Sequence, residues 1–214
     1  MTPADPAAAR LISVNLGLAR PLLASGRRVL SAIGKQPVAG PVAVARLGLA
    51  GDEQADLSVH GGLDKAVYAY PAEHLAYWQA KRLEHSVSLW DEALPSGFVG
   101  ENLSLQGLLE AQVWVGDELH FPGCVLRVTA PREPCYKFNA VMGYPQAARD
   151  MMLAGCCGFY LAVKQGGTIE ADLTVTKLDD ETFWVVASDT AQRHVETHLR
   201  RHFDGHHAFV TDVT

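Results

Sequence analysis

The sequence has no long hydrophobic run and no recognisable leader. Apolar stretches are interrupted every few residues, so the 214-residue chain lacks the run of about 20 apolar residues that a membrane-spanning helix needs. The first residues place proline and acid ahead of any apolar stretch, which is not the pattern of a secretory signal. These absences predict a cytoplasmic protein that has no membrane partner.

Cysteine is scarce and is not arranged for zinc. The four cysteines are Cys124, Cys135, Cys156 and Cys157, with no CxxC pair among them. That spacing matches neither a disulfide framework nor a structural zinc site. In a reducing cytosol, we therefore expect all four to be thiols.

Charge is moderate and unevenly distributed. Charged residues make up 20% of the chain and hydrophobic residues 48%, which is typical of a globular protein. The net charge of −6 argues against general nucleic-acid binding. Residues 1–167 hold 15 acidic against 14 basic side chains, whereas residues 168–214 hold 9 against 4. This shift predicts a boundary at Gly166–Gly167, between a main domain (1–167) and an atypical C-terminal segment (168–214).

The hydrophobic patterns predict many short strands and few helices. Alternating or β-branched runs punctuated by glycine predict strands within residues 10–23, 40–49, 110–121, 124–130 and 158–165. Pro71 suits the first turn of one helix, and a second short helix is expected within 144–155, stopped by Gly155. The pattern favours a β-rich α+β fold built on a closed or half-closed barrel.

The C-terminal segment has a pattern of its own. Strands are expected at 172–178 and 183–188, a helix at 189–203 and a strand at 208–214, giving a β-β-α-β order that is too small to fold alone. His194, His198 and His202 recur every four residues on the expected helix. No carboxylate or thiol of matching spacing accompanies them, so we interpret them as a solvated face rather than a metal site.

The stretch "APREPCYKFN" singles out Cys135. Pro131 and Pro134 restrict the backbone on one side of the thiol. Arg132 and Lys137 are placed to lower its pKa and favour the thiolate. A thiolate suits either a soft metal or a sulfur-transfer reaction.

Three weaker candidates accompany this cysteine. His60 precedes two glycines, which would let the backbone approach a ligand closely. Lys35 lies in a loop between a glycine and a Gln-Pro turn, and Asn102 follows a glycine-rich turn. A solvated lysine and a turn-forming asparagine are the ordinary explanations for the last two.

Taken together, these stretches resemble the MOSC domain, specifically its stand-alone YiiM-like branch. The resemblance rests on "LGLAGDEQADLSVHGGLDKAVYAYPAEH", "GFVGENLS", "VGDEL" and "APREPCYKFN", and runs from about residue 10 to residue 164. It implies a β-barrel that binds a molybdopterin-type molybdenum cofactor. It also implies reduction of N-hydroxylated compounds such as hydroxylaminopurines, by oxygen-atom removal at a Cys-ligated molybdenum.

The resemblance assigns roles to individual residues. Cys135 would be the metal ligand and a catalytic residue. From its residue type, and not from the resemblance, we further expect His60 to donate a proton to the leaving oxygen. The cofactor-binding residues would be Lys35, His60, Gly61, Gly62, Asn102 and Arg132. The expected partners are a small N-hydroxylated substrate, an electron-donor protein and, in a homodimer, a second copy of the chain.

Two other functions use the same pocket. In one, Cys135 carries a persulfide and the protein is a sulfur carrier or sulfurase-type transferase. In the other, the protein binds or delivers the cofactor without turnover. The sequence does not separate these alternatives from the reductase.

The C-terminal segment departs from the YiiM-like pattern, which usually continues into a small helical domain. "IEADLTVTKL" and "FVTDVT" instead resemble a fragment of the aminomethyltransferase-like domain of sarcosine and dimethylglycine dehydrogenases. Most of that domain is missing, so folate binding is not expected. Loss of the helical domain would weaken a contact with the electron donor or with a second copy.

Overall fold

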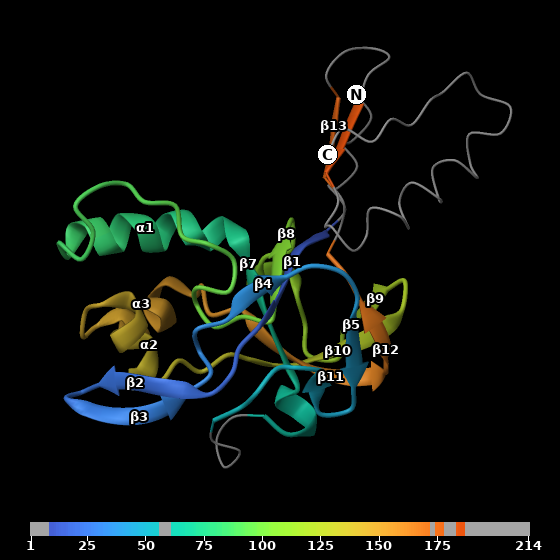
Figure 1. Ribbon diagram of the computed structural model, residues 1–214, viewed down its shortest axis with the longest axis horizontal. Helices are drawn as coiled ribbons and strands as arrows, with labels where there is room; N and C mark the ends of the chain where they lie inside the picture. The colour runs from blue at the N-terminus through green and yellow to red at the C-terminus, as the bar shows by residue number, and fades with distance from the viewer. Residues whose placement is uncertain (1–8, 56–60, 172–173, 178–182, 187–214) are drawn as a thin grey trace, which may run out of the picture.

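The computed structural model describes residues 9–55, 61–171, 174–177 and 183–186. Its main sheet has seven strands that curl into a half-barrel (Figure 1). In sheet order these strands are β4 (Gln36–Val38), β1 (Arg10–Leu16), β8 (Leu103–Gln106), β7 (Val67–Pro71), β11 (Phe159–Gln165), β10 (Cys124–Pro131) and β9 (Glu118–Phe121). All neighbours pair antiparallel except β7 and β8, which are parallel. The predicted β-rich barrel is confirmed.

Smaller strand groups complete the architecture. A three-stranded sheet has the order β12 (Gly167–Ile169), β5 (Val42–Ala45) and β6 (Gly48–Leu49). Two hairpins are formed by β2 (Arg20–Ala24) with β3 (Arg27–Ser31) and by β13 (Thr174–Lys177) with β14 (Phe183–Val186). The β13–β14 hairpin confirms the first two strands predicted for the tail. The helix and strand expected at 189–203 and 208–214, including the three histidines, lie outside the described residues.

The domain boundary predicted at Gly166–Gly167 remains a prediction. Strand β12, which begins at this boundary, is nevertheless integrated with the barrel. Thr168 pairs with Ala43, and Ile169 is buried in the barrel core. The residues immediately after the composition shift are therefore integrated with the first part of the chain.

The helices gather on one side of the half-barrel (Figure 1). They are α1 (Leu75–Glu84), α2 (Tyr136–Met142) and α3 (Ala147–Ala154), with three-residue 3-10 turns η1 (Leu63–Lys65), η2 (Ala72–His74) and η3 (Glu110–Gln112). The α1 and α3 helices were expected, and Gly155 ends α3 in a left-handed conformation as predicted. The α2 helix was not expected, and residues 110–112 form η3 instead of the predicted strand.

Two hydrophobic cores share strand β7. One fills the half-barrel and includes Val67 and Ala69; the other lies under the helices and includes Tyr68 and Tyr70. Successive side chains of a strand point to opposite faces, so β7 contributes to both cores and all five of its residues are buried. Trp78 of α1 donates a hydrogen bond to the Tyr70 hydroxyl over 2.6 Å, which anchors the helical layer to this strand.

Glu110 explains why η3 replaces the predicted strand. Its Oε1 accepts the Gly158 amide over 2.7 Å, and its Oε2 lies 2.8 Å from His74 Nε2. Burial alone would raise the pKa of Glu110, but the hydrogen bonds from His74 and Gly158 outweigh burial and lower the pKa below its usual value. The carboxylate therefore ties η3 to the end of β7 and the start of β11.

We expect Glu110→Gln to lower the free energy of unfolding by about 1–2 kcal/mol at neutral pH, because one charge-assisted contact is lost. The folded-state pKa is lowered, so this stabilisation is complete above the unfolded-state value of 4.5 and disappears as the pH falls through the folded-state value. Urea unfolding of both proteins at pH 7 and at strongly acidic pH measures the difference. An equal difference at the two pH values would contradict this account.

Candidate functional site

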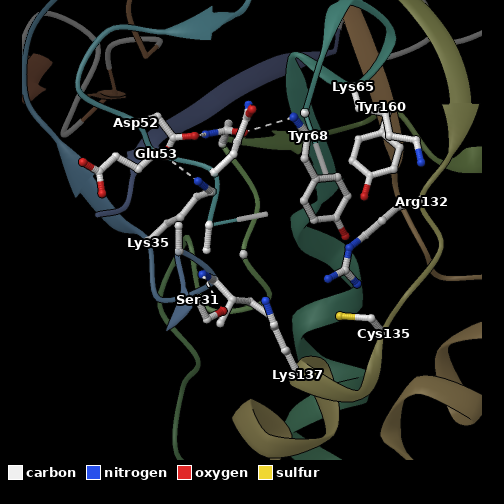
Figure 2. Close-up of a pocket in the computed structure, with 17 residues that line it drawn as sticks. Ser31, Lys35, Asp52, Glu53, Lys65, Tyr68, Arg132, Cys135, Lys137 and Tyr160 are labelled. Carbon is white, nitrogen blue, oxygen red and sulfur yellow. Dashed lines mark hydrogen bonds and ion pairs between the residues drawn. The ribbon is translucent and has the colours of Figure 1, made fainter. Parts of the chain in front are cut away.

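A cavity opens where the loop after β3, the loop at residues 52–55, strand β7 and the start of α2 meet (Figure 2). Together with its open mouth, part of which is open solvent, it measures about 650 Å³. Its described walls are Ser31, Ala32, Ile33, Lys35, Asp52, Glu53, Gln54, Ala55, Gly61, Lys65, Tyr68, Gly100, Asn102, Arg132, Cys135, Lys137 and Tyr160.

Cys135 is held by the junction between β10 and α2. The Arg132 amide donates to the Gly158 carbonyl over 3.1 Å, which ties the end of β10 to the chain just before β11. Cys135 then takes an extended conformation directly before α2, and its carbonyl accepts the Phe138 amide over 2.9 Å. The side chain is half-buried, and Figure 2 shows its sulfur turned toward the cavity beside the Arg132 guanidinium.

Arg132 is a buried cation without a carboxylate partner among the described residues. Its side chain is 7% exposed, its Nη1 lies 3.3 Å from the Met151 sulfur, and its guanidinium carbon lies 4.9 Å from the centre of the Tyr68 ring. Arginine stays charged in proteins, and a buried charge is normally paired with an opposite one. This guanidinium is therefore arranged to receive an anionic group from outside the chain.

Lys35 contrasts with Arg132, because its charge is paired. Its ammonium contacts a carboxylate oxygen of Asp52, and that carboxylate also accepts the Gly17 amide over 2.8 Å and the Asn102 side-chain amide over 2.9 Å. Burial lowers the pKa of Lys35, while the adjacent Asp52 opposes this shift. Asp52 thus fixes the lysine at the cavity wall.

Asn102 lines the cavity and also organises its framework. Its side-chain oxygen accepts the Tyr68 amide over 3.1 Å, and its side-chain nitrogen donates to the Asn15 carbonyl over 3.2 Å as well as to Asp52. Every polar atom of the amide side chain therefore has a partner within the chain. We conclude that Asn102 positions Asp52 and, through it, Lys35.

The glycine motif is only partly described. Gly61 lines the cavity with a φ of 85°, a backbone conformation that glycine adopts without the strain a side chain would cause. Gly62 precedes η1 and is not among the cavity's lining residues. His60 lies outside the described residues. The roles expected for His60 and Gly62 therefore stay predictions.

Several lining residues were not proposed as site residues from the sequence. Lys137 donates to the Leu30 carbonyl over 2.9 Å, and the Lys65 ammonium lies 5.4 Å from the centre of the Tyr160 ring. Burial raises the pKa of Tyr160, although a hydrogen bond with Arg132 works in the opposite direction, so its phenol keeps its proton at neutral pH. The alternation of tyrosine with small or β-branched residues in β7 was an available signal for Tyr68, but β11 shows no such pattern around Tyr160.

The walls carry an excess of positive charge. Lys35, Lys65, Arg132 and Lys137 face two carboxylates, Asp52 and Glu53, which leaves two positive charges in excess among the described lining residues. Within the described part of the chain, no three His, Cys, Asp or Glu side chains gather as a metal-binding group. The site thus offers one soft sulfur ligand and several cations, a set that suits an anionic ligand containing a thiophilic atom.

No helix in the described residues is long and apolar enough to cross a membrane. This agrees with the short, interrupted hydrophobic runs of the sequence.

Comparison with known proteins identifies the family. The MOSC domain family matches residues 56–176. Protein YiiM of Escherichia coli is 37% identical over 155 residues, which are 71% of this chain and 67% of that protein. A protein of Gibberella moniliformis named "Reductase" is 34% identical over 157 residues, 73% of this chain but only 27% of that protein. The crystal structure of YiiM from Geobacillus stearothermophilus superposes with a TM-score of 0.59 and 28% identity, covering 95% of this chain and 94% of that one. The chain belongs to the MOSC domain family, as its sequence motifs predicted.

Proposed function

We propose that the protein binds a molybdopterin-type molybdenum cofactor and reduces N-hydroxylated compounds by removing their oxygen. One observation carries the proposal: the half-buried thiol of Cys135 and the guanidinium of Arg132, which has no carboxylate partner among the described residues, face one cavity whose described walls carry a net positive charge. Family membership supports the cofactor, and a relative named as a reductase supports the reaction class.

The residues present fit such a cofactor. A buried guanidinium that meets no carboxylate in the described part of the chain matches the anionic phosphate that the cofactor carries. One cysteine is enough on the protein side, because the dithiolene of the pterin supplies further sulfur ligands. Arg132, Lys137, Lys65 and Lys35 would hold the anionic groups, and Cys135 would hold the metal.

When bound, the cofactor supplies two-electron redox chemistry, so that an N–OH compound, two electrons and two protons give the amine and water. The chain's own residues bind, orient and supply protons. Tyr160 keeps its proton at neutral pH and lies at the cavity wall, where it can donate a hydrogen bond. His60 remains our proposed proton donor to the leaving oxygen, because imidazole is the side chain most used for proton transfer near neutral pH.

The test begins with protein from two hosts, one that makes the cofactor and one that cannot. Protein from the first host is expected to contain molybdenum and pterin in near-equal amounts, and to reduce 6-hydroxylaminopurine when dithionite is supplied. Protein from the second host is the matched control and is expected to be inactive. Full molybdenum loading without turnover of any N-hydroxylated compound would contradict the reductase.

The same preparations separate the two alternative functions. A labile extra sulfur on Cys135 in the mass spectrum, without molybdenum, would indicate the sulfur carrier. Stable loading followed by release of the pterin to an acceptor protein, without turnover, would indicate the delivery protein. We further propose a cytoplasmic location, a separate electron-donor protein and a homodimer. The electron donor follows from the proposed reductase reaction, and the location and the homodimer follow from the sequence. None of the three follows from the cavity.

A further inference from the structure

The N-terminal quarter of the chain is strongly basic although the whole chain is acidic. Residues 6–51 contain six Lys or Arg side chains and no Asp or Glu, in a protein whose net charge is −6. Three of the six, Arg20, Arg27 and Arg28, lie on the β2–β3 hairpin and are exposed. No carboxylate among the described residues forms an ion pair with any of these three. The hairpin therefore presents unneutralised positive charge to solvent.

The hairpin also has one packed face and one open face. Residues paired across an antiparallel ribbon share a face, so the register places Ala24 and Ser31 on one face and the pairs Pro21–Leu30 and Leu23–Arg28 on the other. Ala24 and Ser31 are buried, whereas Leu23 is 68% exposed and Leu30 is 57% exposed. Arg28 lies on the open face with the two leucines, whereas the exposed Arg20 and Arg27 begin their strands on the face of Ala24 and Ser31. Exposed apolar side chains next to a cation are features of a protein interface.

The packed face of the hairpin adjoins the cavity wall, and the open face lies on the other side of the same ribbon. Lys137 of α2 donates its hydrogen bond to the Leu30 carbonyl, and Ser31 is itself a lining residue. The β2 strand packs against α2, the helix that begins immediately after Cys135. Figure 1 shows the hairpin beside α2 and remote from β5 and β12. A protein seated on the open face would therefore have one two-stranded ribbon between it and the proposed cofactor.

We propose that the open face of the β2–β3 hairpin docks an acidic electron-donor protein. The inference rests on the proposed function, which needs two electrons for each N–OH group reduced. A reduced donor would deliver them one at a time, two donor molecules being oxidised for each amine and water formed, with both protons taken from solvent. Positive charge beside apolar side chains steers and then holds an acidic partner.

Two other occupants fit the hairpin less well. A second copy packed by two-fold symmetry would place Arg28 of one hairpin near Arg28 of the other, and like charges oppose that contact. The net charge of −6 would oppose nucleic acid and an acidic protein alike, so the choice between them rests on the hairpin itself. The exposed Leu23 and Leu30 suit a protein partner, because nucleic-acid binding depends mainly on phosphate contacts with clustered cations.

The experiment uses the full-length, cofactor-loaded protein with Arg28→Glu as the test variant. Arg46→Glu is the matched control, because Arg46 is exposed, belongs to the same acid-free segment and lies beside β5 at the other end of the molecule. The probes are two acidic redox proteins, a plant-type ferredoxin and a flavodoxin. Calorimetric titration at low ionic strength measures binding, and turnover is measured with each reduced probe and with dithionite.

We expect Arg28→Glu to weaken binding of an acidic probe, and the turnover it drives, by about tenfold or more, with the effect shrinking at high salt. Dithionite-driven turnover and cofactor content should not change, and Arg46→Glu should behave as wild type. Leu23→Ser should weaken binding without altering its salt dependence, since it removes apolar contact only. This combination would support docking on the hairpin.

Other outcomes overturn the proposal. It fails if neither probe binds, if Arg46→Glu is as damaging as Arg28→Glu, or if Arg28→Glu changes only binding of a DNA duplex. It also fails if Arg28→Glu converts a dimer to a monomer in sedimentation, which would assign the hairpin to a second copy. Absence of dithionite-driven turnover refutes the proposed function instead, and the titration then still decides the docking surface.

Discussion

Replacement of Cys135 by alanine is expected to reduce turnover of N-hydroxylated compounds by about a thousandfold or more. Loss of a residue that hydrogen-bonds to a metal ligand commonly lowers metal affinity or activity by about 10- to 100-fold, and loss of a direct ligand lowers them further. In the proposed function, Cys135 is the protein's own bond to the metal, so nothing else in the cavity replaces it. The cations that would hold the anionic groups remain, and part of the pterin should therefore stay bound.

Turnover, molybdenum and pterin should be measured on the same Cys135→Ala preparation. Cys124→Ala is the matched control, because Cys124 is 1% exposed in the half-barrel core and is not a lining residue. The Cys124→Ala variant should be less stable than the wild type, because the substitution leaves a small cavity, and should keep the wild-type activity per bound metal. Full activity of Cys135→Ala per bound metal would remove Cys135 from the metal site.

Arg132→Met is expected to weaken retention of the cofactor by about 10- to 100-fold, which corresponds to the loss of one or two charge-assisted hydrogen bonds. The same substitution should leave the cofactor-free protein as stable as the wild type, or more stable. A buried charge without an opposite partner is costly, and a methionine of similar length fills the space between Tyr68, Phe138 and Met151 without that cost. Binding and stability should thus change in opposite directions.

Thermal unfolding of the cofactor-free protein and pterin content after repeated desalting measure these two effects. Arg149→Met is the control, since Arg149 is exposed on α3 and lines no part of the cavity. A large loss of stability in cofactor-free Arg132→Met would show that Arg132 serves the fold rather than a ligand. Unchanged pterin retention would remove it from the binding site.

Local sequence signals predicted the best-marked part of the site. Cys135 and Arg132 occur in one proline-rich stretch, and Lys35 and Asn102 follow glycine turns, so each could be proposed from its near neighbours. All four line the cavity. The strands were predictable for the same reason, because period-two alternation is a property of a few adjacent residues.

Long-range contacts explain what was missed. Asp52 meets Lys35 and Asn102 only because β1 lies between β4 and β8 in the sheet, and no pattern in the sequence reveals that order. The α2 helix has seven residues, too few for intrinsic helix propensity to identify. It is stabilised from outside, by burial of Phe138 and by the Asn139 side chain, which accepts the Ala148 amide over 2.7 Å.

Strand β7 makes the two halves of the molecule cooperative. Val67 and Ala69 pack inside the half-barrel, while Tyr68 and Tyr70 pack under the helices, so one short backbone segment is common to both cores. Neither core can lose its order without releasing this strand from the other. Tyr68 is at the same time a wall of the cavity. Local opening of this wall of the site would therefore disturb both cores, which places β7 among the parts of the fold that are costliest to open.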